Sequence, residues 1–130
     1  MKEILLRELV IMKEVNSLDW SYDLEYDILF IHRIEKYEYE VSIEMTCDVL
    51  MDFDTLLNPS AFEFLNASKI FKSNNGDLCD INTIKVHVSI NEDLIKLYVD
   101  IFTQNNKFST IKKFINDIDA PSCERDMLAS

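Results

Sequence analysis

The stretch TIKVHVSINEDLIKLYVDIF, residues 83–102, alternates apolar and polar side chains on both sides of a short polar break. Two runs share this alternation: Ile84, Val86, Val88 and Ile90, then Ile95, Leu97, Val99 and Ile101. A period of two places the apolar residues of each run on one face of a strand. Residues 91–93 separate the runs, so the stretch predicts an antiparallel β-hairpin with one buried face. Its solvent face would carry Lys85, His87, Ser89, Lys96 and Asp100.

Upstream, the segments 24–34 (LEYDILFIHRI) and 36–45 (KYEYEVSIEM) predict two more strands, antiparallel because their connection is short. In the second, Tyr37, Tyr39, Val41, Ile43 and Met45 fall at odd positions. Glu38, Glu40 and Glu44 fall at even positions, so one face of this strand would carry a row of carboxylates. A third short strand is predicted at 47–54, and the polar stretch 17–23 is interpreted as a bend.

Three helices complete the expected fold. Residues 3–15 are apolar on a wide face, which indicates a helix buried against a sheet or shared with a second subunit. Residues 61–71 follow a capping-box pattern of Ser60 and Glu63, and 108–118 place Ile111, Phe114, Ile115 and Ile118 at helical spacing. Residues 73–82, with the single glycine of the chain, predict a loop. The order α-β-β-(β)-α-β-β-α is that of an α+β fold, with helices packed on an antiparallel sheet.

Composition sets the broad class. The 130 residues are 48% hydrophobic, which is enough for one compact domain over 1–130, with a flexible tail expected at 119–130. The net charge of −11 argues against direct nucleic-acid binding and against anionic membranes, and it permits a basic protein partner. Many acidic proteins bind no basic partner, so charge alone does not establish one.

Cysteine usage and the apolar segments indicate the compartment. Cys47, Cys79 and Cys123 are odd in number and fit no metal-binding spacing, so we expect reduced thiols. Charges interrupt the apolar amino-terminal segment, unlike a signal peptide, and no run approaches the roughly 20 apolar residues that span a bilayer. A cytoplasmic protein is therefore expected.

No residue pattern predicts catalysis. His32 and His87 are isolated histidines on predicted strands, and Cys47 could form a nucleophile pair with one of them only if the fold joins them. The aspartates at 48, 52 and 54 lack the spacing of a calcium loop, and a single glycine excludes glycine-rich phosphate loops. We therefore expect no enzyme, no cofactor and no metal.

The most suggestive feature is acidic residues interspersed with aromatic ones. Trp and Tyr dominate interface hot spots, so this mixture is typical of a protein-recognition surface. The alternative is that the aromatic residues border the core while the carboxylates are solvated. On the first interpretation, the partner-binding residues would be Asp19, Trp20, Asp23, Glu25, Glu38, Glu40 and Glu44.

Two family resemblances bear on function. The order of a middle helix (SAFEFLNASKIF), a hairpin (KVHVSINEDLIKLYVDIF) and a closing helix (FSTIKKFINDI) resembles class I type III secretion chaperones, which implies a homodimer that holds an unfolded effector. The short, acidic, Ile-, Asn-, Lys- and Asp-rich chain also resembles bacterial toxin immunity proteins of the contact-dependent growth inhibition type. That resemblance implies a non-enzymatic protein that binds and neutralises a cognate toxin, with a basic nuclease domain as the expected partner. The chaperone and an acidic DNA-mimic inhibitor are the alternatives.

Overall fold

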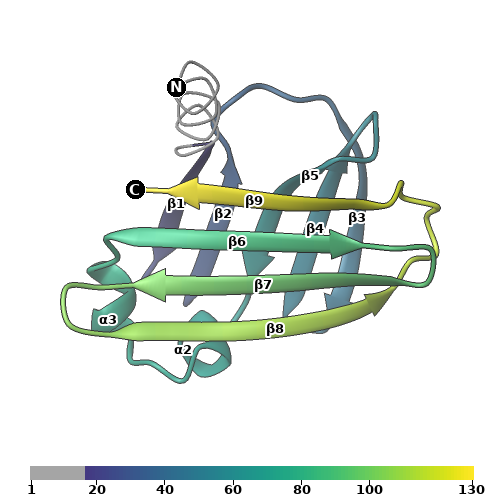
Figure 1. Ribbon diagram of the computed structural model, residues 1–130. Helices are drawn as coiled ribbons and strands as arrows, with labels where there is room; N and C mark the ends of the chain where they lie inside the picture. Colours follow the sequence, from purple (N-terminus) through teal and green to yellow (C-terminus); the bar gives the residue numbers. More distant parts are fainter. Residues whose placement is uncertain (1–16) are drawn as a thin grey trace, which may run out of the picture.

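The chain folds into two antiparallel β-sheets packed face to face (Figure 1). The computed structural model describes residues 17–130. The first sheet, sheet A, has the strand order β1-β2-β5-β4-β3, and the second, sheet B, has the order β8-β7-β6-β9. The strands of sheet A are β1 (Leu18–Asp23), β2 (Ile28–Arg33), β3 (Tyr39–Thr46), β4 (Val49–Asp54) and β5 (Pro59–Phe64). Those of sheet B are β6 (Thr83–Ile90), β7 (Leu94–Phe102), β8 (Lys107–Ile115) and β9 (Cys123–Ala129).

Only two short helices occur in residues 17–130, α2 (Ala67–Ile70) and α3 (Asn75–Cys79), both in the connection between the sheets. The predicted α+β class is therefore wrong, because the sheets cover each other and no helix of the described part covers a sheet. Figure 1 shows the four-stranded sheet in front of the five-stranded one, with its strands crossing those behind at a steep angle. The helix predicted at 3–15 lies outside the described residues.

The helix predicted at 61–71 is wrong in its first half, which is the central strand β5. Ala61, Phe64 and Leu65 have helical spacing, but Phe62 and Phe64 also alternate with Ala61 and Glu63 as a strand requires. Pairing with β2 on one side and β4 on the other satisfies the backbone and buries both phenylalanines completely. Tertiary pairing therefore decided between two periods that the local pattern left equally open.

The helix predicted at 108–118 is wrong as well, because residues 107–115 form the edge strand β8. Phe108 and Phe114 pack toward the core while Ile111 and Ile115 are exposed, so apolar residues occur on both faces and imitate a helical stripe. The expected tail contains β9, and the expected bend at 17–23 contains β1. The expected loop at 73–82 holds α3, which begins at a capping box between Asn74 and Asp77.

The hairpin at 83–102 is confirmed as β6 and β7, paired in unbroken register from Thr83↔Phe102 to Ile90↔Ile95. Strands at 28–33, 39–46 and 49–54 are also confirmed. The predicted antiparallel pairing of the segments 24–34 and 36–45 is wrong, because β2 pairs with β1 and β5 while β3 pairs with β4. The core lies between the sheets. One inward row of sheet A runs across all five strands as Trp20, Ile31, Phe62, Met51 and Ile43, facing the apolar residues of the hairpin.

The chaperone resemblance rested on helices that the structure replaces. Its middle helix begins as β5 and its closing helix is β8, so the element order that carried it is absent from residues 17–130. Within these residues, no helix is long and apolar enough to cross a membrane.

Candidate functional site

The outer face of sheet A carries two rows of side chains that cross all five strands. Strand register and alternation place Asp19, His32, Ala61, Asp52 and Ser42 in one row. The second row contains Ser21, Phe30, Glu63, Leu50 and Glu44. Asp23 continues the face at the end of β1. We call the outward residues Asp19, Asp23, Phe30, His32, Glu44, Leu50, Asp52 and Glu63 the acidic face.

The charge of the chain is concentrated on this side of the molecule. Residues 17–66, which contain sheet A, hold 12 acidic residues and two basic ones, for a net charge of −10. Residues 67–130 hold nine acidic and eight basic residues, for a net charge of −1. Neither basic residue of the first segment belongs to the acidic face, since Arg33 points inward and Lys36 lies between β2 and β3.

The acidic face is not uniformly charged. The rings of Phe30 and His32 stack with centroids 5.1 Å apart on β2, the strand beside the edge strand β1, and Leu50 is half-buried on β4. Carboxylates flank this apolar part on both sides. Such an arrangement, with an apolar centre inside a polar rim, is typical of protein–protein interfaces.

The structure brings together only part of the predicted contact set. Asp19, Asp23 and Glu44 are exposed on the acidic face, but β1 and β3 are opposite edges of sheet A, about 19 Å apart at four strand spacings. Glu25 is exposed in the β1–β2 turn, and Trp20 points inward against the core.

The predicted row of three glutamates is broken by the geometry of β3. The β3–β4 register shifts between Tyr39 and Val41, which leaves Glu40 without a partner in the ladder. Glu38 precedes the strand, so Glu44 is the one member of the row that stands in regular alternation. The shift also explains why Tyr39 is 61% exposed, although the unbroken alternation predicted it on the buried face.

The β1–β2 turn presents two large apolar side chains beside the acidic face. Leu24 is 55% exposed and Tyr26 is 66% exposed. Asp27 braces the turn from behind, because its carboxylate accepts hydrogen bonds from the Tyr22 hydroxyl at 2.6 Å and from the Ser68 hydroxyl at 2.6 Å. Burial opposes ionisation of Asp27, but the bonds from Ser68 and Tyr22 outweigh it and hold its pKa below the ordinary value. The turn is thus a rigid, partly apolar protrusion.

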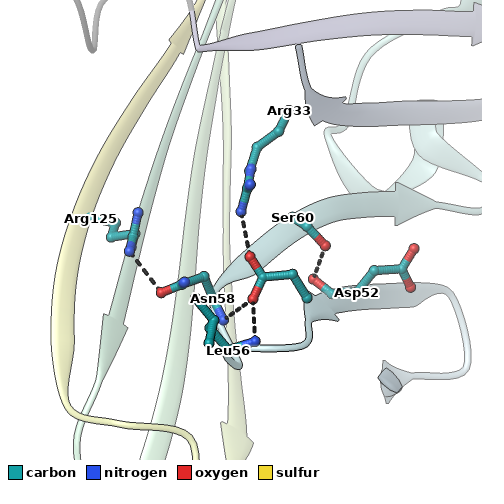
Figure 2. Close-up of polar contacts among 7 residues, drawn as sticks. Arg33, Asp52, Leu56, Asn58, Ser60 and Arg125 are labelled. Carbon is teal, nitrogen blue, oxygen red and sulfur yellow. Dashed lines mark hydrogen bonds and ion pairs between the residues drawn. The ribbon is translucent and has the colours of Figure 1, made fainter. Parts of the chain in front are cut away.

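A second feature is a polar cleft of about 780 Å³ between β9 and sheet A, with Arg33, Asn58 and Arg125 among the residues that line it. Asp54 is buried behind two of the lining residues: it accepts hydrogen bonds from Arg33 Nη1 at 2.8 Å and from the backbone N–H groups of Leu56 and Asn58, both at 2.9 Å (Figure 2). Arg125 of β9 donates to the Asn58 side chain at 2.7 Å (Figure 2). The Arg125–Asn58 bond joins the two sheets, and the Asp54 bonds hold the β4–β5 turn within sheet A, so we assign this cleft a structural role.

Burial disfavours the charged form of Asp54, yet the donors Asn58, Arg33 and Leu56 outweigh it and lower its pKa below the ordinary value.

The second histidine, His87, lies on the outer face of sheet B, with Nε2 at 2.8 Å from Glu124 and Nδ1 at 2.7 Å from Asp126. Its partial burial disfavours the imidazolium, but Asp126 and Glu124 prevail and raise its pKa.

The structure does not join the histidines to a cysteine. Cys47 lies in the β3–β4 turn, His32 is on β2 at the other side of β4 and β5, and His87 belongs to the other sheet. Asp48, Asp52 and Asp54 also do not converge, since each has its own partner: Asn66, Ser42 and Arg33. Within residues 17–130, no group of three His, Cys, Asp or Glu side chains is arranged to hold a metal ion.

Sequence reasoning missed the centre of the acidic face. Alternation in the predicted strand at 24–34 puts Phe30 and His32 on one face, as the structure has them, but nothing in the sequence pattern connects Asp52 and Glu63 with them. That connection requires the strand order β2-β5-β4, and β5 was predicted to be a helix. A sequence signal did exist for the location of the charge, namely the 12 acidic residues against two basic ones in 17–66.

No family model matches the chain, and no solved structure matches it. The uncharacterized protein MJ0789 of Methanocaldococcus jannaschii is 32% identical over 97 residues, which cover 73% of this chain and 81% of that protein.

Proposed function

The chain belongs to the same family as the uncharacterized protein MJ0789, and from its structure we propose that it is a non-enzymatic module that binds a basic protein. The single observation that carries the proposal is the acidic face, where carboxylates flank half-buried Phe30, His32 and Leu50 and no lysine or arginine of strands β1–β5 points outward.

Electrostatics favours a basic partner over a neutral one. A net charge of −10 in residues 17–66 produces a negative potential on the side of sheet A. Such a potential accelerates encounter with a positively charged surface and disfavours acidic competitors. Because carboxylates on an exposed face contribute more to association rate than to affinity, the affinity would come from the apolar groups among them.

The β1–β2 turn supplies further apolar contact area. Leu24 and Tyr26 protrude from a turn that Asp27 ties to Tyr22 and Ser68, so little conformational freedom remains to be lost on binding. We therefore include Leu24 and Tyr26 with Asp19, Asp23 and Glu44 in the proposed contact surface.

The specific form we propose is a toxin immunity protein, with a basic nuclease domain as partner. An acidic face complements a surface that binds a phosphate backbone, and occupying that surface would block the nuclease. We also propose a cytoplasmic location, where Cys47, Cys79 and Cys123 would remain the free thiols that the structure shows.

The test uses the full chain, tagged, to capture its partner from the native host, followed by binding kinetics on the purified pair. A triple reversal on the acidic face (Asp19→Lys, Glu44→Lys, Glu63→Lys) is compared with a matched reversal on the other half (Glu92→Lys, Asp93→Lys, Asp117→Lys). We expect the first to slow association by about tenfold at low salt, with the difference shrinking as salt rises, and the second to change it little.

If both triple variants slowed association equally, only net charge would matter, and the acidic face would not be the binding site. Capture of a partner with an acidic binding surface would refute the proposed function itself.

A further inference from the structure

One edge of sheet B is left open along a long, regular strand. β8 runs for nine residues and pairs with β7 along its whole length, without a register shift. In Figure 1 it is the lowest strand of the front sheet, and no further strand of residues 17–130 pairs with its other side.

The pattern of hydrogen bonds between β7 and β8 determines which backbone N–H and C=O groups of β8 point away from β7. Asn106 O accepts from Thr103 N–H at one end, and Asp93 O accepts from Asn116 N–H at the other, both at 2.9 Å. In an antiparallel ladder, bonded pairs alternate with unbonded ones, so every second residue between these points directs its N–H and C=O away from β7. These residues are Lys107, Ser109, Ile111, Lys113 and Ile115.

Other edges are less accessible to an added strand. The β3 ladder has two register shifts, which bend an edge away from regular pairing. β1 has six residues, and its outward Trp20 N–H is already bonded to the Asp19 carboxylate. β9, the other edge of sheet B, has seven residues and contacts β1, as β8 contacts β3. Of the four edges in the described part of the chain, β8 is the longest strand, its register is unbroken, and every second residue directs its N–H and C=O away from β7.

The side chains of β8 indicate the chemistry of an added strand. Residues 107–115 contain three lysines and no acidic residue, in a chain of net charge −11. Lys113 stands opposite Lys96 of β7, which extends the positive charge across the outer face. Ile111 and Ile115 are 57% and 69% exposed on the same face.

We propose that β8 is a docking edge for an extended acidic segment of a partner protein, which adds to sheet B as a fifth strand. Backbone hydrogen bonds to Ser109, Ile111 and Lys113 would hold it, as in other cases of strand addition. Carboxylates at alternate positions would lie beside Lys107 and Lys113, with apolar residues on Ile111. Like charge disfavours pairing of β8 with the β8 of a second copy.

The first test is amide hydrogen exchange on the isotope-labelled full chain with two synthetic nine-residue peptides. One alternates Glu with Thr and Val, and the other replaces each Glu with Lys. We expect the acidic peptide to slow exchange at the amides of Ser109, Ile111 and Lys113 and to leave Phe108, Thr110 and Phe114 unchanged, because β7 already protects these. Equal effects of both peptides, or protection elsewhere, would overturn the proposal.

Two kinds of variant separate backbone pairing from charge. The Ile111 N–H points away from β7 and makes no hydrogen bond to it. Ile111→Pro removes this N–H and should abolish peptide binding, whereas Ile111→Thr keeps the N–H and should retain peptide binding. The double variant Lys107→Glu and Lys113→Glu should lower the affinity for the acidic peptide by about tenfold. The control double variant Lys69→Glu and Lys72→Glu, with one residue on α2 and one just after it, should change that affinity little.

Binding that survives Ile111→Pro and the reversal at 107 and 113, in folded variants, would refute the docking edge. If exchange at Ser109, Ile111 and Lys113 slows with protein concentration in the absence of peptide, the occupant is a second copy and the proposed partner is wrong. Neither result bears on the acidic face, so the two proposals fail separately.

Discussion

Replacement of Asp54 by alanine should be among the most destabilising substitutions of a charged residue in this protein. The carboxylate accepts from three donors, Arg33, Leu56 and Asn58, and its side chain is only 9% exposed. Breaking a buried ion pair typically costs about 3–5 kcal/mol, because the remaining charge is left unpaired. Arg33 keeps 18% exposure and lies over the ring of Tyr37, which relieves part of that penalty.

We therefore expect Asp54→Ala to lower the unfolding free energy by about 3 kcal/mol, a large share of the roughly 5–15 kcal/mol of a typical domain. Asp54→Asn keeps an acceptor for the turn N–H groups and loses the ionic partner of Arg33, so it should cost about 1–2 kcal/mol. Asp100→Ala is a matched control, since Asp100 lies on an exposed face with one hydroxyl partner, Ser109, and a solvent-screened lysine, Lys107, at 4.0 Å.

The assay is urea unfolding at pH 7, followed through the fluorescence of Trp20, the single tryptophan, which packs against the core. Because the pKa of Asp54 is lowered in the folded state, its contribution is present above the unfolded value of about 3.8 and disappears as pH falls through the folded value. The difference in unfolding free energy between wild type and Asp54→Ala should therefore become smaller below pH 4. A loss under about 1 kcal/mol at pH 7 would refute the reasoning that this carboxylate holds the turn.

Three further changes test other parts of the structure. Asp27→Ala should cost about 2–3 kcal/mol in urea unfolding, because the Ser68 and Tyr22 hydroxyls and the Ser68 N–H lose their acceptor; a change below about 0.5 kcal/mol would contradict the bracing role. The raised pKa of His87 means that its stabilising contribution is complete below about pH 6.5 and is lost as pH rises through the folded value. The melting temperatures of wild type and His87→Gln should therefore differ more at pH 5.5 than at pH 9. A larger difference at pH 9 would contradict a raised pKa for His87. Lys72→Gly should stabilise the protein by about 0.5–1 kcal/mol, because Lys72 occupies a left-handed conformation (φ 52°) after α2 where glycine is unstrained; destabilisation in urea would contradict this.

The part of the fold that was predictable from sequence is the part with one dominant period. In 83–102, eight aliphatic residues alternate without exception around a three-residue polar break, and a helix would scatter them over its surface. Residues 59–64 and 107–115 have no such dominant period. Phe62 and Phe64 allow alternation, while Phe64, Leu65 and Phe71 allow a helical stripe, and only the partners β2 and β4 decide between them.

The scarcity of glycine also misled the interpretation of turns. A chain with one glycine is expected to form few tight turns, because glycine adopts left-handed conformations at the lowest cost. The structure instead uses other residues in left-handed conformations, among them Asp27, Leu57 and Asn66. Leu57 is the costly case, and the bonds from the Leu56 and Asn58 N–H groups to Asp54 compensate for it.

Strand topology determines whether an uneven distribution of charge along a sequence becomes an uneven distribution in space. Here each sheet is built from one contiguous segment, with β1–β5 from residues 18–64 and β6–β9 from residues 83–129. The excess of 12 acidic over two basic residues in 17–66 therefore remains on one sheet. A fold that interleaved early and late strands would have mixed those carboxylates with the lysines of residues 67–130. Because this fold keeps them apart, the acidic face and the lysine-bearing edge of β8 can serve two partners of opposite charge.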